Sequence, residues 1–173
     1  MENEKDQSVL VSDYAIENFK NGLNCAESVY EALLKTDALE DIDKSTVAMC
    51  LGFGGGVGLS GCMCGALSAA IMANGAKYGR PDPWSIDESV RGEQIAQKYY
   101  RRYNNIIHEF IDRNGSAICA EISAQFDDFK CHERKVNCLK LIGATATLAY
   151  KYLRIPQSKA EKLPYRENLG GNV

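Results

Sequence analysis

Cysteine is the residue type most able to do chemistry in this 173-residue chain. Seven cysteines are present, at positions 25, 50, 62, 64, 119, 131 and 138. The first residues, Met1–Gln7, are polar and acidic, so we expect no secretory signal and a reducing, cytoplasmic location. In such a compartment structural disulfides are rare, and a cysteine excess indicates metal binding or redox chemistry.

Three of the cysteines are predicted to lie at the starts of helices. Cys25 follows Asn24, which forms a capping-box pair with Glu27. Cys64 follows a glycine-rich loop, and Cys119 lies in the first turn of a short predicted helix. Free N–H groups and the helix dipole at such positions lower the pKa of a thiol, and they can donate hydrogen bonds to a thiolate or a cluster sulfide.

The loop before Cys64 contains glycines that allow the backbone to approach a bound group closely. We predict Gly55, Gly56 and Gly58 as cofactor-binding residues for this reason. Residues 56–61 also match the dinucleotide-binding pattern G-x-G-x-x-G. That pattern belongs between a strand and a helix, and the chain shows no alternating strands, so nucleotide binding is not favoured.

Cysteine spacing argues against several common sites. No C-x-x-C is present, which removes the thioredoxin-type motif and the usual zinc-knuckle spacing. Asp128 stands three residues before Cys131, so C-x-x-C-H is missing and we expect no covalent haem. Cys62 can face the same site as Cys64 only if it lies in the loop. Cys50 is predicted to fill the core.

Charge and hydropathy exclude two classes of partner. The net charge is -3, with -8 over residues 1–43 and +5 over the remainder, far from the strongly basic balance of nucleic-acid-binding domains. Residues 47–76 contain no charged residue. Glycines in the middle of this stretch would break a membrane-spanning helix, so we expect two buried helices around a glycine loop and no membrane insertion.

The apolar periodicity predicts an all-α fold, a compact bundle of about five to seven helices with a glycine-rich loop before a central buried helix. Helices are expected over about 12–21, 24–36, 45–51, 62–78, 85–114 and 132–153, with a short turn after 116. Arg101 and Arg102 are expected on a solvated face. Residues 8–156 should form one cysteine-rich redox domain, and 157–173 a loosely packed C-terminal arm that adds nothing to the core.

The cysteines and the glycine loop recur in a specific order between about residues 12 and 153. That order comprises Asn24–Val29, Gly52–Gly58, Cys64–Leu67, Ile71–Met72, Lys77–Gly79, Cys119 and Cys138. In these segments the chain resembles the redox-active protein family named for its C, GCAxxG, C, C pattern. Ala69 stands where that pattern favours glycine, and Cys62 and Cys131 are additional.

The resemblance implies a ligand set. The four cysteines of the family correspond to Cys25, Cys64, Cys119 and Cys138, and Cys62 and Cys131 would be auxiliaries. Relatives of the family include the split-Soret cytochromes, which pair a similar helical domain with c-type haems and an iron–sulfur centre. Binding of an iron–sulfur cluster is therefore implied, whereas the missing C-x-x-C-H says that the haem is not inherited.

Three functions remain open. The leading hypothesis is a cytoplasmic iron–sulfur protein that transfers electrons through a cluster held by the four family cysteines. The second is a thiol/disulfide oxidoreductase in which Cys64 attacks and Cys25 or Cys62 resolves, which requires a depressed thiol pKa. The third is a structural zinc site. The protein that donates or accepts electrons is unknown, and a homodimer is one of the oligomeric states left open.

Overall fold

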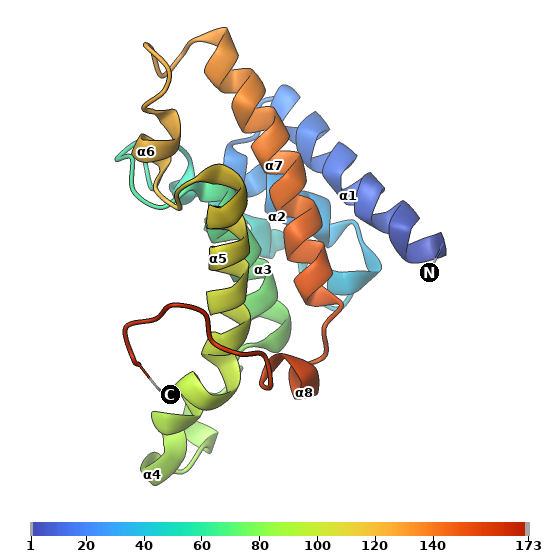
Figure 1. Ribbon diagram of the computed structural model, residues 1–173. Helices are drawn as coiled ribbons and strands as arrows, with labels where there is room; N and C mark the ends of the chain where they lie inside the picture. Colours follow the sequence, from blue (N-terminus) through green and yellow to red (C-terminus); the bar gives the residue numbers. More distant parts are fainter. Residues whose placement is uncertain (1, 172–173) are drawn as a thin grey trace.

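The computed structural model describes residues 2–171, with side chains from residue 7 onward (Figure 1). Within that range the chain forms no β-strand, so the predicted all-α class is confirmed. The α-helices are α1 (Glu2–Lys20), α2 (Cys25–Leu34), α3 (Gly65–Tyr78), α4 (Glu88–Arg91), α5 (Arg101–Asn114), α6 (Cys119–Ser123), α7 (His132–Leu153) and α8 (Gln157–Ala160). The 3-10 helices are η1 (Asp37–Leu39), η2 (Lys44–Phe53) and η3 (Pro83–Ser85), and η4 (Ile95–Tyr100) is a π-helix.

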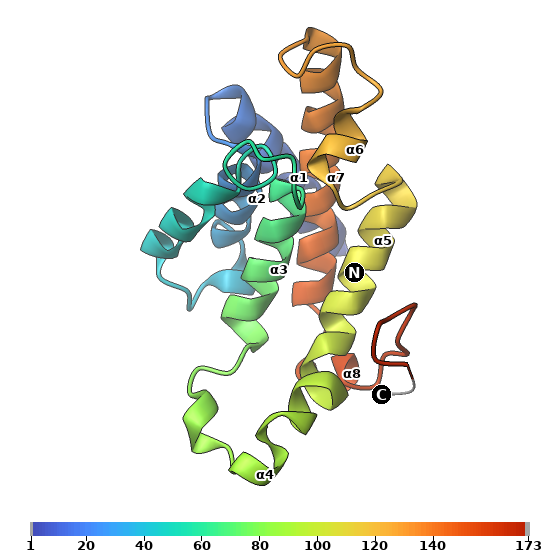
Figure 2. The same ribbon diagram turned by 90° about the vertical axis from the view of Figure 1, so that its left-hand side faces the viewer.

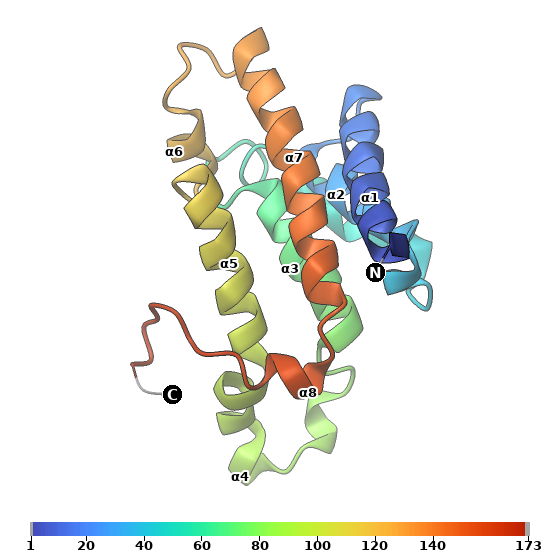
Figure 3. The ribbon, with the colours of Figure 1, turned by 45° about the vertical axis from the view of Figure 1, so that its right-hand side comes forward.

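Helix α7 packs against the other long helices of the bundle. It contacts α1, α2, α3 and α5, and α2 fills the space between α1 and α3 (Figures 1 and 3). Helix α3, the predicted central helix, packs against α2 and α7, and eight of its first ten residues are buried. Over the described residues, no helix is both long enough and apolar enough to cross a membrane.

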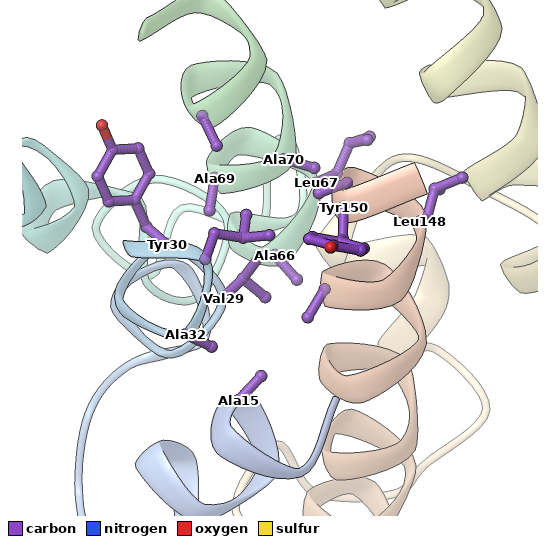
Figure 4. Close-up of a cluster of buried hydrophobic side chains, with 14 of the residues drawn as sticks. Ala15, Val29, Tyr30, Ala32, Ala66, Leu67, Ala69, Ala70, Leu148 and Tyr150 are labelled. Atoms are coloured by element: carbon purple, nitrogen blue, oxygen red, sulfur yellow. The ribbon is translucent and has the colours of Figure 1, made fainter. Parts of the chain in front are cut away.

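Small side chains let these helices pack closely. Ala66, Ala69 and Ala70 of α3 are fully buried, and they belong to the same cluster of buried side chains as Val29 of α2 and Leu148 of α7 (Figure 4). An alanine presents only a methyl group, so neighbouring helices can approach until their larger side chains fill the remaining volume. Alanine in place of the family's glycine at 69 is therefore accommodated within the core.

Local capping explains which helix boundaries were predictable. The capping box of Asn24 and Glu27 is present, and α7 begins and ends where the sequence predicts. By contrast, α1 starts at Glu2 and not at Ser12. The segment before the glycine loop, η2, is a 3-10 helix in which only Cys50 is buried. The expectation of two buried helices around the loop is therefore right for α3 and wrong for η2.

The predicted helix over 85–114 is broken into several pieces. Asp87 caps α4 through the Ser89 amide, in place of the expected capping box at Ser85. Helix α4 then leads through the π-helix η4 into α5, which lies at an angle to it (Figure 2). A π-helix carries a wider hydrogen-bonded turn, a deviation that apolar periodicity does not report.

The C-terminal arm contributes more to packing than predicted. Ala160 is fully buried and Leu163 packs against the core, so the expectation that residues 157–173 add nothing to the core is wrong for the described part of the arm. The Tyr165 hydroxyl donates to the Ala96 carbonyl at 2.6 Å, which ties the arm to η4. The division into a domain over 8–156 and an arm stays a prediction.

Arg102 is buried and not solvated, contrary to expectation. Its guanidinium donates to the carbonyls of Tyr152 and Ile155, and its Cζ lies 3.9 Å from the centre of the Tyr78 ring. Carbonyls at the end of a helix have no partner within that helix, and Arg102 supplies one for the end of α7. This side chain therefore fixes α5 to α7.

Arg102→Met should lower the free energy of unfolding by about 2–4 kcal/mol, because two poorly hydrated carbonyls lose charged donors. Chemical denaturation of the metal-free protein measures the change. Arg113→Met is the matched control, since Arg113 forms an exposed ion pair with Glu109 on the same helix and its loss should cost under about 1 kcal/mol. Equal losses for the two variants would contradict the role of Arg102.

Candidate functional site

The four cysteines that match the family pattern line one cavity. Its volume is about 420 Å³. Cys25, Cys119 and Cys138 reach it from α2, α6 and α7, and Cys64 reaches it from the position just before α3. The glycine loop lies beside this region and leads into the start of α3 (Figure 2). The other residues that line the cavity are Phe19, Asn24, Leu51, Gly54, Gly55, Gly58, Leu59, Phe129, Arg134, Leu141 and Ile142.

The helix starts place three of these thiols as predicted. Cys25 is the first residue of α2, Cys119 is the first residue of α6, and Cys64 is the N-cap of α3. Asn24 accepts hydrogen bonds from the amides of Ala26 and Glu27 and donates to the Leu51 carbonyl at 3.1 Å. The cap thus also attaches the start of α2 to η2.

A short antiparallel bridge holds Cys64 next to Cys119. The Cys64 amide donates to the Ala117 carbonyl at 2.8 Å, and the Cys119 amide donates to the Cys62 carbonyl at 2.7 Å. These two bonds join the end of the glycine loop to the segment that starts α6. Two cysteines 55 positions apart in the sequence are therefore fixed side by side by backbone hydrogen bonds.

The loop itself takes an unusual left-handed path. Positive φ angles occur at Gly55, Gly56 and Gly58, and also at Val57 and Leu59, where φ is 64° and 68°. A β-branched residue such as valine rarely adopts this conformation, so the loop stores backbone strain. Of the predicted cofactor-binding glycines, Gly55 and Gly58 line the cavity, whereas Gly56 lies behind Cys119.

Two glycines leave room for the cysteine side chains. A Cβ at Gly65 would lie 2.5 Å from Cys25 Sγ and 2.6 Å from the Phe53 carbonyl oxygen. A Cβ at Gly56 would lie 2.7 Å from the Cβ of Cys119. Real Cβ atoms do not approach neighbours this closely, so both positions require glycine.

Burial raises the pKa of the cavity thiols. It raises the pKa of Cys64 to about 12, although the amides of Leu67 and Ala66 act in the opposite direction. Burial also raises the pKa of Cys25, although a hydrogen bond from the Gly55 amide acts to lower it. The pKa of Cys138 is likewise raised by burial, although the positive charge of Arg134 acts to lower it. In the metal-free protein, loss of water therefore outweighs the helix-start amides.

The remaining cysteines lie outside the cavity lining. Cys62 is exposed in the glycine loop, and Cys131 caps α7, where its sulfur accepts from the Arg134 amide at 3.4 Å. Cys50 is fully buried away from the cavity, as expected for core packing. Neither predicted auxiliary, Cys62 or Cys131, is brought to the four thiols.

Sequence reasoning missed Arg134, whose buried side chain lines the cavity. One signal was present, since Arg134 lies in the first turn of α7, where the helix dipole disfavours a positive charge.

The thiols surround a space and are not gathered around a point. Among the described side chains, no three or more Cys, His, Asp or Glu groups are arranged to hold a single metal ion. Four thiolates around one zinc ion would lie within about 4 Å of one another, given Zn–S bonds of about 2.3 Å. The four thiols therefore line the wall of the cavity without converging on one point.

Comparison with known proteins agrees with this arrangement. Residues 23–152 match the family described as "Putative redox-active protein (C_GCAxxG_C_C)". The chain belongs to this family. The matched range includes the glycine loop and all four cysteines of the cavity, so redox activity and a cysteine-rich site are family properties of this protein.

The similar protein that the comparison found carries no functional name. An "Uncharacterized protein" of Archaeoglobus fulgidus (strain ATCC 49558 / DSM 4304 / JCM 9628 / NBRC 100126 / VC-16) is 24% identical over 144 residues, which covers 81% of this chain and 91% of that protein. No solved structure matches this chain.

Gly65→Ala should destabilise the protein by about 1–3 kcal/mol and displace Cys25, because the new methyl group overlaps its sulfur. Thermal unfolding and the alkylation rate of Cys25 measure the two effects. Gly75→Ala on the same helix is the control, since its nearest neighbour there would be the Tyr103 hydroxyl at 3.8 Å. Wild-type behaviour of Gly65→Ala would refute the close approach.

The raised pKa of Cys64 also predicts a pH dependence. An unfolded thiol ionises near its ordinary pKa of 9.0, whereas folded Cys64 stays protonated to about 12. Its contribution is thus fully present below pH 9 and is lost as pH rises between the two values. In denaturation of reduced, metal-free protein, the fall in stability from pH 8.5 to 10 should be shallower for Cys64→Ala. An unchanged slope would count against burial of this thiol.

Proposed function

We propose that this protein holds an iron–sulfur cluster through Cys25, Cys64, Cys119 and Cys138 and transfers electrons. The observation that carries the proposal is that four thiols, three within separate helices and one at the N-cap of a fourth, line one cavity. Complete thiolate coordination by four cysteines is typical of two-iron and four-iron clusters. A reduced protein partner would supply the electron and an oxidised one would receive it.

The residues present fit such a group in size and chemistry. The cavity of about 420 Å³ is far larger than one metal ion needs, and no described group of three ligands is set for a single ion. Both features favour a cluster over the structural zinc site. Apolar side chains, Leu141 and Ile142 among them, form much of the wall and would limit access of water.

The protein would orient and tune the ligands through backbone amides. The Gly55 amide donates to the sulfur of Cys25, and the amides of Ala66 and Leu67 act to lower the pKa of Cys64. Amides placed in this way stabilise negative charge on the sulfurs and would raise the reduction potential of a cluster that these sulfurs bind. When bound, the cluster would supply reversible one-electron reduction and oxidation, which these side chains alone lack.

The thiol/disulfide alternative is less well supported. It requires an attacking thiolate at neutral pH, whereas burial raises the pKa of Cys64 to about 12 and also raises that of Cys25. A metal, by contrast, displaces the proton from a thiol that it binds, so a raised pKa does not prevent ligation. The cytoplasmic location and a homodimeric state stay predictions.

Anaerobic reconstitution with iron and sulfide should yield a coloured protein containing two or four irons per chain. Replacement of any of the four cavity cysteines by serine should abolish or strongly reduce the iron and sulfide content and alter the paramagnetic resonance spectrum. Cys50→Ala is the control, because Cys50 is buried outside the cavity, and its iron content should equal that of the wild type.

Colourless wild-type protein without iron or sulfide after reconstitution would overturn the proposal. Equal iron loss in Cys50→Ala would show that loss of packing, and not loss of a ligand, explains the cysteine variants. Cys62→Ser and Cys131→Ser test the auxiliary roles, and both should retain the cluster because neither side chain lines the cavity.

A further inference from the structure

Arg134 places a positive charge in the wall of the cysteine cavity. Its side chain lies in the first turn of α7, only 8% of the residue is exposed, and its Nη2 lies 4.0 Å from Cys119 Sγ. Among the described residues that line the cavity, Arg134 is the one charged side chain. A single guanidinium therefore supplies the formal charge in the described lining of this cavity.

The groups that hold Arg134 are neutral. Its Nε donates to Ser123 Oγ at 3.0 Å, and its Nη1 donates to the Phe129 carbonyl at 3.0 Å. The ring of Phe129 covers the guanidinium, with its centre 3.4 Å from Cζ. Of the described carboxylates, none forms an ion pair with Arg134. The side chain is thus fixed in place without being neutralised.

This arrangement is unfavourable unless an anion completes it. Buried charges are normally paired, and the first turn of a helix disfavours a cation. A guanidinium remains charged throughout the range in which proteins fold, so it cannot escape the penalty by losing a proton. The position of Arg134 therefore points to negative charge that the cavity acquires when its thiols become ligands.

We propose that Arg134 is a positioning residue that supplies the counter-charge of the cysteine site, so that the cavity favours anionic occupants and an easily reduced cluster. The cluster itself rests on the proposed function. Four thiolates give such a site net negative charge, and an added electron increases it. Arg134 offsets that charge through space, and no proton needs to move.

The reconstituted protein provides the first test, by titration with dithionite and redox mediators. Arg134→Gln should lower the reduction potential, so that the ratio of reduced to oxidised cluster at a fixed potential falls about tenfold, equivalent to about 59 mV for one electron. Arg134→Lys retains the charge and should stay close to the wild type. Lys135→Gln removes an exposed charge one position along α7 and should have little effect.

The metal-free protein provides a second test that does not need iron. Iodoacetate is an anion and iodoacetamide is its neutral counterpart. The ratio of the iodoacetate rate to the iodoacetamide rate at one cysteine therefore reports the local charge, because the fraction of thiolate affects both rates equally. At Cys119 the ratio should fall about threefold or more in Arg134→Gln but not in Lys135→Gln. Peptide mapping by mass spectrometry resolves the site. In the wild type alone, the ratio should be higher at Cys119 than at exposed Cys62.

The outcomes separate this inference from the proposed function. If Arg134→Gln loses the preference for the anionic reagent but the wild type binds no iron, the counter-charge role of Arg134 is supported and the proposed cluster is overturned. If Arg134→Gln binds a normal cluster with an unchanged reduction potential and unchanged alkylation ratios, the cluster is supported and the role of Arg134 is overturned. Equal impairment by Arg134→Lys and Arg134→Gln would assign Arg134 to packing alone. Should Arg134→Gln not fold, the wild-type comparison of Cys119 with Cys62 decides the matter.

Discussion

Bringing four thiols to one cavity requires backbone segments to approach more closely than a Cβ allows. Gly65 gives space to the sulfur of Cys25, and Gly56 gives space to the side chain of Cys119. The bridge between residues 61–64 and 117–120 then holds the glycine loop against the start of α6. The strained left-handed turn of the loop is maintained by these contacts, because an isolated chain would not adopt it.

Desolvation dominates the chemistry of the site. The helix starts do direct amides toward Cys25 and Cys64, yet burial shifts the pKa of both thiols upward. A cavity that disfavours free thiolates but carries donors and one guanidinium suits sulfur that becomes negative only through coordination. The same apolar surroundings that suppress reactivity of the free thiols would protect a bound cluster from water.

Helix prediction succeeded where local interactions decide the boundary. The Asn24 cap and the limits of α7 depend on residues within a few positions of each other. Prediction failed between 85 and 114, where the chain passes through the π-helix η4, and at the C-terminal arm, whose packing depends on α5 and η4. The packing of the arm arises from contacts between distant segments, and the wider turn of the π-helix departs from the α-helical period, so apolar periodicity predicts neither feature.

The sequence by itself determined the all-α class, the three cysteines at helix starts and, through the family pattern, the four cysteines that belong together. Only the tertiary structure decided that Arg102 and Arg134 are buried, and that Cys62 and Cys131 lie outside the cavity. A helix start follows from neighbouring residues, whereas the burial of a charge or a thiol depends on which distant surface packs against it.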